Sequence, residues 1–103
     1  MLESSRNQWE EASRRVADEA RDPVRHRQLL DLVAVVADEL RRRVGGSFTL
    51  ADLDRAYGRA EDWVRDAVED ALPPRARVGV ADAALVQDAA FAVYARGAVD
   101  YRP

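Results

Sequence analysis

Residues 23–44 read PVRHRQLLDLVAVVADELRRRV, and this stretch predicts a helix roughly 30 Å long. Asp22 is a natural N-cap, and Pro23 suits the first helical turn because its missing N–H is not needed there. Gly45 and Gly46 then end the helix. Its apolar face is wider than the seam of a coiled coil and indicates contact with two neighbours. The face consists of Leu29, Leu30, Leu32, Val33, Val35, Val36, Ala37, Leu40 and Val44.

A first helix precedes this stretch, with Ser4 and Ser5 as its N-cap candidates. One apolar stripe recurs along it at spacings of three and four residues: Trp9, Ala12, Val16 and Ala20. The link at Asp22 is short, and helices joined by short links are usually neighbours. The sequence therefore predicts that the first two helices form an antiparallel hairpin.

The segment after the two glycines predicts two more helices. Thr49 and Asp52 form the pattern of a capping box with Asp in place of Glu, so a short helix is expected over residues 50–57. Gly58 ends it or bends the chain, and another helix follows over 60–72 until a pair of prolines stops it. The apolar stripe of that helix is Trp63, Val64, Ala67, Val68, Ala71 and Leu72. The two helices together have the outline of a helix-turn-helix.

The last predicted helix starts at Asp82, its expected N-cap, and extends to about Arg96, after a loop over residues 75–80. It is apolar nearly all round, and only Gln87 and Asp88 interrupt it. A helix of this kind is either central in the core or half of an oligomer interface.

These elements predict an all-α fold, with one domain of about five helices over residues 1–103. The N-terminal hairpin is followed by the pair that resembles a helix-turn-helix and by the apolar C-terminal helix. A chain of this length buries about two-thirds of its surface on folding, which is enough for a core without disulfides. Residues 1–5 and 98–103 are candidate flexible tails, and the segment after Gly97 either packs back on the helices or hangs free.

The composition excludes several classes of protein. The chain has no cysteine, which excludes disulfides and thiolate metal sites, and no lysine, which excludes a phosphate loop with Gly-Lys. No apolar run approaches the roughly 20 residues of a membrane helix, and the N-terminus lacks the pattern of a signal peptide. His26 is the single histidine, and no nucleophile or dinucleotide motif is present. We therefore expect a cytoplasmic protein that is not an enzyme, with no metal, no cofactor and no membrane partner.

The first functional hypothesis is a protein–protein interaction module: a small regulatory or adaptor protein, or one that forms a homodimer. It rests on the absent catalytic motifs, on the apolar last helix and on residue types that are frequent at interfaces. The candidate partner-binding residues are Tyr57, Tyr94, Arg96, Tyr101, Arg41, Arg42 and Arg43. Each has an alternative role. The tyrosines can be core anchors, and the three consecutive arginines suit a helix C-terminus, where Asp38 and Glu39 can pair with Arg42 and Arg43.

The alternative hypothesis is a DNA-binding transcriptional regulator of the helix-turn-helix type that uses residues 49–77. Its candidate DNA-binding residues are Arg59, Arg65, Arg75 and Arg77. The charge of the segment opposes this reading, because residues 49–72 hold seven acidic residues and three arginines, a net charge of −4. The whole chain has a net charge of −3, whereas proteins that bind polyanions usually carry a basic excess. Nucleic acid is therefore the less favoured partner.

Three stretches resemble a group of small helical proteins from high-GC, actinobacterial-type bacteria to which no function is assigned. They are residues 40–53 (LRRRVGGSFTLADL), residues 63–65 (WVR) and residues 94–103 (YARGAVDYRP). The resemblance implies a bacterial, cytoplasmic origin. It transfers no catalytic or binding residue.

Overall fold

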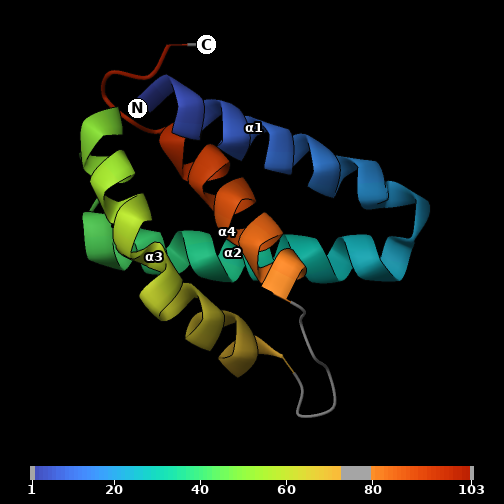
Figure 1. Ribbon diagram of the computed structural model, residues 1–103. Helices are drawn as coiled ribbons and strands as arrows, with labels where there is room; N and C mark the ends of the chain where they lie inside the picture. The colour runs from blue at the N-terminus through green and yellow to red at the C-terminus, as the bar shows by residue number, and fades with distance from the viewer. Residues whose placement is uncertain (1, 73–79, 103) are drawn as a thin grey trace.

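Figure 1 shows the computed structural model, which describes the backbone of residues 2–72 and 80–102 and the side chains of residues 6–72 and 82–102. No strand occurs in these residues. The helices are α1 (Leu2–Asp18), the 3₁₀ helix η1 (Glu19–Arg21), α2 (Pro23–Val44), α3 (Leu50–Ala71) and α4 (Val80–Ala95). The prediction of a single all-α domain is confirmed, with four α-helices in place of about five.

The helix α2 has the predicted ends. The Asp22 side chain accepts a hydrogen bond from the Arg25 backbone N–H at 3.2 Å, and a proline occupies the first turn. At the other end Gly45 has φ +95°, and its N–H donates to the Arg41 carbonyl at 2.9 Å. Of the predicted apolar face, Leu30 is 45% exposed. The residues that enter the core are Leu29, Leu32, Val33, Val36 and Leu40.

The helix α1 starts earlier than predicted. It begins at Leu2, so Ser4 and Ser5 lie inside the helix and the prediction that they cap it is wrong. An N-cap is worth only about 1 kcal/mol, so this preference is easily outweighed. The predicted stripe is buried at Trp9, Ala12 and Val16, whereas Ala20 is exposed because the chain has turned into η1 there.

The helix α3 runs through Gly58 without a break, so the predicted separation into two helices is wrong and the helix-turn-helix arrangement is not confirmed. A glycine inside a helix costs about 1 kcal/mol relative to alanine, which is less than the gain from burying a continuous stripe. That stripe is Leu53, Ala60, Val64 and Val68. The predicted capping box is confirmed: the Thr49 Oγ1 accepts from the Asp52 N–H at 3.1 Å, and the Asp52 carboxylate accepts from the Thr49 N–H at 3.0 Å.

The helix α4 is the centre of the bundle and packs against α1, α2 and α3 (Figure 1). Its nearly uniform apolar surface therefore serves the core. The predicted hairpin is not confirmed as a packed pair, because α1 makes most of its contacts with α4 and few with α2. Asp82 lies in the first turn of α4 instead of capping it, and its side chain accepts a hydrogen bond from Arg25 at 3.0 Å.

The chain after Gly97 packs back on the helices. The Val99 N–H donates to the Phe48 carbonyl at 2.9 Å, and the Asp100 carboxylate accepts from the Leu50 N–H at 2.8 Å. Ala98 is buried in the core. These contacts tie the segment that follows α4 to the start of α3.

Candidate functional site

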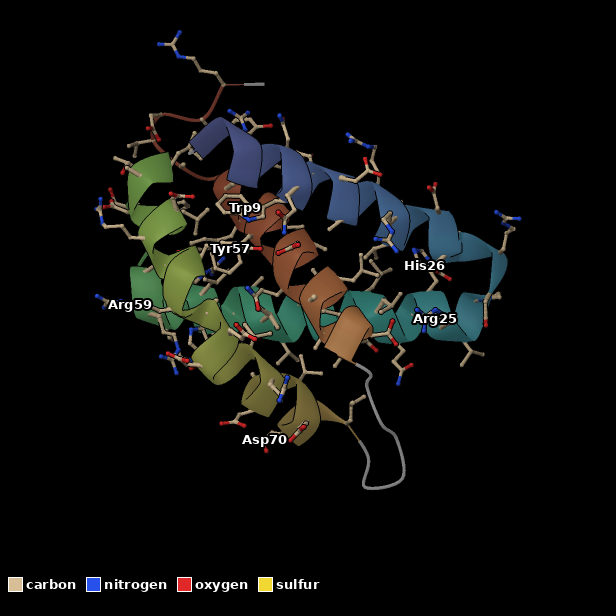
Figure 2. All side chains as sticks on the ribbon, in the orientation of Figure 1. Trp9, Arg25, His26, Tyr57, Arg59 and Asp70 are labelled. Carbon is tan, nitrogen blue, oxygen red and sulfur yellow. The ribbon has the colours of Figure 1, made fainter. Side chains whose placement is uncertain are left out.

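The tyrosines predicted to bind a partner all make contacts within the molecule. The Tyr57 ring lies 5.3 Å from the Trp9 ring and 5.1 Å from the Phe91 ring, measured between centroids (Figure 2). The Tyr94 ring stacks on Phe48 at 4.4 Å, and its hydroxyl donates to a backbone carbonyl. The Tyr101 ring lies under the Arg6 guanidinium at 4.7 Å. Tyr57, Tyr94 and Tyr101 are half-buried and pack against the core.

The predicted basic residues are divided between internal pairs and open surface. Arg42 and Arg43 both contact the Glu39 carboxylate, at 2.9 Å and 3.4 Å. The predicted pair of Glu39 with Arg43 is therefore observed, whereas Arg42 pairs with Glu39 in place of Asp38. The Arg96 guanidinium lies 3.5 Å from a carboxylate oxygen of Glu10. Arg41 makes no ion pair with any described side chain, and it lines a surface hollow beside Tyr94.

A surface hollow of about 370 Å³ lies where the end of α2 meets α3. We call it the Arg–Trp hollow, and it is lined by Leu40, Arg43, Val44, Ala56, Arg59, Asp62 and Trp63. Leu40 is fully buried, whereas Trp63 is half-buried and Arg59 is exposed. The hollow therefore has an apolar floor and a charged edge, to which α3 contributes Arg59, labelled in Figure 2.

Two guanidinium groups dominate the Arg–Trp hollow. The Arg43 guanidinium lies over the Trp63 ring, 4.7 Å from its centroid, in a cation–π arrangement. Arg59 makes no ion pair with the side chains of residues 6–72 or 82–102, and Asp62 supplies one opposing charge. Arginine holds carboxylates through paired, planar N–H donors, so this edge can bind an acidic group while the floor takes an apolar side chain.

From the sequence, Trp63 is predicted to lie in the core, and Arg59 is predicted only as a candidate DNA-binding residue. The periodicity of α3 places Trp63 near the apolar side, but it does not show how deeply each residue is buried. One pattern in the sequence could have indicated this hollow. An arginine is followed four residues later by a tryptophan, and the preceding helix ends in a run of arginines.

Of the residues proposed for DNA, the two that the structure describes do not share one helix face. Arg59 and Arg65 are six positions apart on α3, which turns them by roughly 240° about the helix axis. Arg59 lines the Arg–Trp hollow, and Arg65 lines a different hollow. Arg75 and Arg77 lie outside the described residues.

A polar cluster interrupts the core beside Tyr57. The Tyr57 hydroxyl donates to the Asp88 carboxylate at 2.6 Å, and the Gln8 amide donates to the other Asp88 oxygen at 2.9 Å. Burial and the hydrogen bond to Asp88 raise the pKa of Tyr57 well above its usual range. In the sequence, Asp88 is visible only as an interruption of an apolar helix. A single acidic residue at such a position indicates a buried polar cluster.

A metal site and a membrane-spanning helix are both absent from the residues that the structure describes. No group of three or more His, Asp or Glu side chains that could hold a metal ion occurs among those that the structure describes. His26 is half-buried near the start of α2 (Figure 2). Within residues 2–72 and 80–102, no helix combines the length and the apolar character needed to cross a membrane.

No protein-family model matches the sequence, and no curated protein and no solved structure matches it either.

Proposed function

We propose that this protein is a non-enzymatic interaction module that binds an acidic segment of another protein at the Arg–Trp hollow. The observation that carries the proposal is the Arg43 guanidinium held over Trp63, with Arg59 on the facing edge. Tryptophan and arginine are the residue types that most often contribute the binding energy of an interface. Here they surround one hollow whose floor is apolar.

The chemistry of the hollow defines the partner. Two guanidinium groups favour a segment with Asp or Glu, and the space between Val44 and Ala56 favours an apolar side chain next to that acid. Arg41 and Arg42 extend the basic surface at the end of α2, where positive charge is already favoured by the helix dipole. An amphipathic acidic helix or an extended acidic segment meets both requirements.

DNA fits this surface less well. Residues 49–72 have a net charge of −4, and they form the α3 side of the hollow. A duplex carries one negative charge per roughly 1.7 Å of its axis, so a long stretch of phosphates would come close to these carboxylates. A protein segment presents its acidic groups at chosen positions and avoids that repulsion.

The test compares partner recovery by three forms of the tagged full chain in the cells that naturally produce it. The forms are the unchanged protein, Arg59→Glu, and the control Arg15→Glu, which reverses an exposed arginine on α1. We expect the unchanged protein and the control to retain the same partner and Arg59→Glu to lose it, with an affinity weakened at least tenfold, a typical loss for a hot-spot arginine. The recovered partner should contain an acidic segment.

Two outcomes contradict the proposal. Equal recovery by all three forms would place the interaction elsewhere on the surface. Salt-dependent binding of duplex DNA that survives Arg59→Glu, with no protein recovered, would favour the nucleic-acid hypothesis instead.

A further inference from the structure

We propose a second binding site: the hollow beside Asp88 takes a small zwitterion of amino-acid size, with its ammonium group on Asp88 and its anionic end toward Arg65. This hollow has a volume of about 220 Å³ and lies between α1, α3 and α4. We call it the Asp88 hollow, and it is lined by Gln8, Tyr57, Glu61, Arg65, Ala83, Ala84, Gln87 and Asp88. It is separate from the Arg–Trp hollow and independent of the function proposed there.

The carboxylate of Asp88 is the first argument. Asp88 is only 8% exposed, and it is the one buried charged residue among those described. The Tyr57 hydroxyl accepts a hydrogen bond from the Gln8 amide at 3.0 Å and donates one to Asp88 at 2.6 Å, so both neighbours act as donors to the carboxylate. An ionised carboxylate has about four acceptor positions, and these two neutral donors occupy two of them.

Asp88 has no cationic partner in the described part of the chain, where the ion pairs join other residues. Buried charges in proteins are normally paired, because removal from water is costly unless an opposite charge compensates. An ammonium group supplies that charge together with three N–H donors. A ligand with a primary ammonium group therefore completes the coordination that Tyr57 and Gln8 begin.

The size of the Asp88 hollow limits the ligand. An apolar cavity of ~150 Å³ holds benzene, so about 220 Å³ admits a ligand of roughly six to eight non-hydrogen atoms. Two of the four α4 residues in the lining, Ala83 and Ala84, are small and leave this space open. Ala84 is exposed, so the hollow is reached from the surface.

The opposite edge of the hollow selects the other end of the ligand. Arg65 lines it, is exposed, and makes no ion pair with the described side chains. A guanidinium at this edge favours a carboxylate or a similar anion on the ligand. Glu61 also lines the hollow, one helical turn before Arg65 on α3, and adds a second negative charge to it. The hollow thus holds charged groups of both signs, which points to a zwitterion.

The experiment follows backbone amide shifts of the full chain by NMR during titration with three probes that share a three-carbon skeleton. They are β-alanine, n-propylammonium and propionate. We expect saturable shifts at Ala83, Ala84 and Gln87 with β-alanine and n-propylammonium, dissociation constants on the order of 1–10 mM, and β-alanine the tighter of the two by about fivefold. Propionate should give no shift at these amides.

Variants assign the two ends of the ligand. Asp88→Asn keeps the shape of the side chain and an acceptor for the Tyr57 hydroxyl. It should weaken the binding of both probes that carry an ammonium group by about tenfold or more. Arg65→Gln should reduce the affinity for β-alanine to the level of the affinity for n-propylammonium. The affinity for n-propylammonium should not change. The matched control is Arg59→Gln, an exposed arginine of the same helix that lines the Arg–Trp hollow and should change neither affinity.

A further variant guards against unfolding of the Asp88 variant. Ala84→Leu fills the hollow from an exposed position, so it should abolish both shifts without disturbing the core. The proposal is overturned if no probe gives a saturable shift up to concentrations on the order of 100 mM. It is also overturned if Asp88→Asn folds and binds n-propylammonium as before, or if propionate binds as well as β-alanine.

Discussion

Tyr57 connects the aromatic core to the polar cluster. Its ring contacts Trp9 and Phe91, while its hydroxyl serves Asp88. The Trp9 indole N–H is buried and finds no hydrogen-bond acceptor among the described residues. The Tyr57 hydroxyl therefore stabilises a carboxylate that has only one other internal donor, the Gln8 amide.

The first prediction concerns this hydroxyl. Tyr57→Phe keeps the ring and removes one of the two donors to Asp88, so the free energy of unfolding should fall by about 1–3 kcal/mol. Denaturant melts measure the difference. The control is Tyr101→Phe, because the Tyr101 hydroxyl makes no hydrogen bond with the described residues, and it should change stability by less than about 0.5 kcal/mol. Equal effects of the two changes would contradict the role given to Tyr57.

The second prediction concerns alkaline pH. Burial and the Asp88 hydrogen bond raise the pKa of Tyr57, and burial raises that of Tyr94. Above about pH 10 the unfolded chain loses these protons while the folded protein keeps them, so the free energy of unfolding is unaffected below that pH and falls as pH rises beyond it. Melts across this range should show a shallower fall in Tyr57→Phe than in the unchanged protein. Parallel slopes in the two proteins would contradict the assignment.

At the level of the helices, two glycines have opposite roles. Gly58 is exposed inside α3, and a Cβ at this position would meet no atom within 4 Å. Gly45 ends α2 with φ +95° and ψ 178°, a conformation that is essentially restricted to glycine. A Cβ at Gly45 also has space, so any cost of substitution there comes from the backbone.

The third prediction uses this pair. Gly58→Ala should raise the free energy of unfolding by about 0.5–1 kcal/mol, because alanine loses less backbone entropy in a helix. Gly45→Ala should lower it by about 1–3 kcal/mol through strain. Thermal or denaturant melts of both variants give the comparison. Destabilisation by Gly58→Ala would mean that α3 bends at this residue.

The two helices also show what the sequence could predict. The bounds of α2 follow from local signals, since Asp22, a proline and two glycines each act within one turn of the helix. The break at Gly58 was wrong because propensity is a local term of about 1 kcal/mol, whereas the stripe from Leu53 to Val68 gains its energy from packing against other helices. Tertiary contacts of this kind are not visible in the sequence.

The candidate sites were predicted only in part. Arg43 was identified from the basic run at the end of α2, but its position over Trp63 depends on where α3 crosses that end. Asp88 was seen as an interruption of α4, yet its donors come from Gln8 and Tyr57, 80 and 31 residues away in the chain. Such sites require the distance between elements, which helical periodicity does not provide.

For the whole molecule, the position of α4 removes one reason to expect a dimer. Most of its apolar residues pack against α1, α2 and α3, and little of its surface is left for a second copy. The large apolar side chains that are exposed in the described residues lie in separate parts of the fold: Val24, Leu30, Val93 and Val99. A stable interface buries roughly 800 Å² on each partner, and four scattered residues do not supply it.

The fourth prediction is therefore a monomer. Light scattering on the full chain should give a mass near 11.5 kDa, independent of concentration. A mass of twice this value would contradict the prediction and favour the homodimer. Shortening the chain to Gly97 is a poor test of this point, because it removes Ala98 from the core and the Val99 contact with Phe48.

The central place of α4 also has a consequence for synthesis on the ribosome. It is the last of the four helices to be made, and about 60 residues separate it from the end of α1. At roughly 5–20 residues per second, the interval lasts about 3–12 s, whereas helices form within microseconds. The nascent chain therefore presents the stripe of α1 to the cell for seconds before its cover arrives. During that time chaperones and proteases can bind the exposed stripe of α1. The speed of translation between α1 and α4 determines how long this stripe stays exposed.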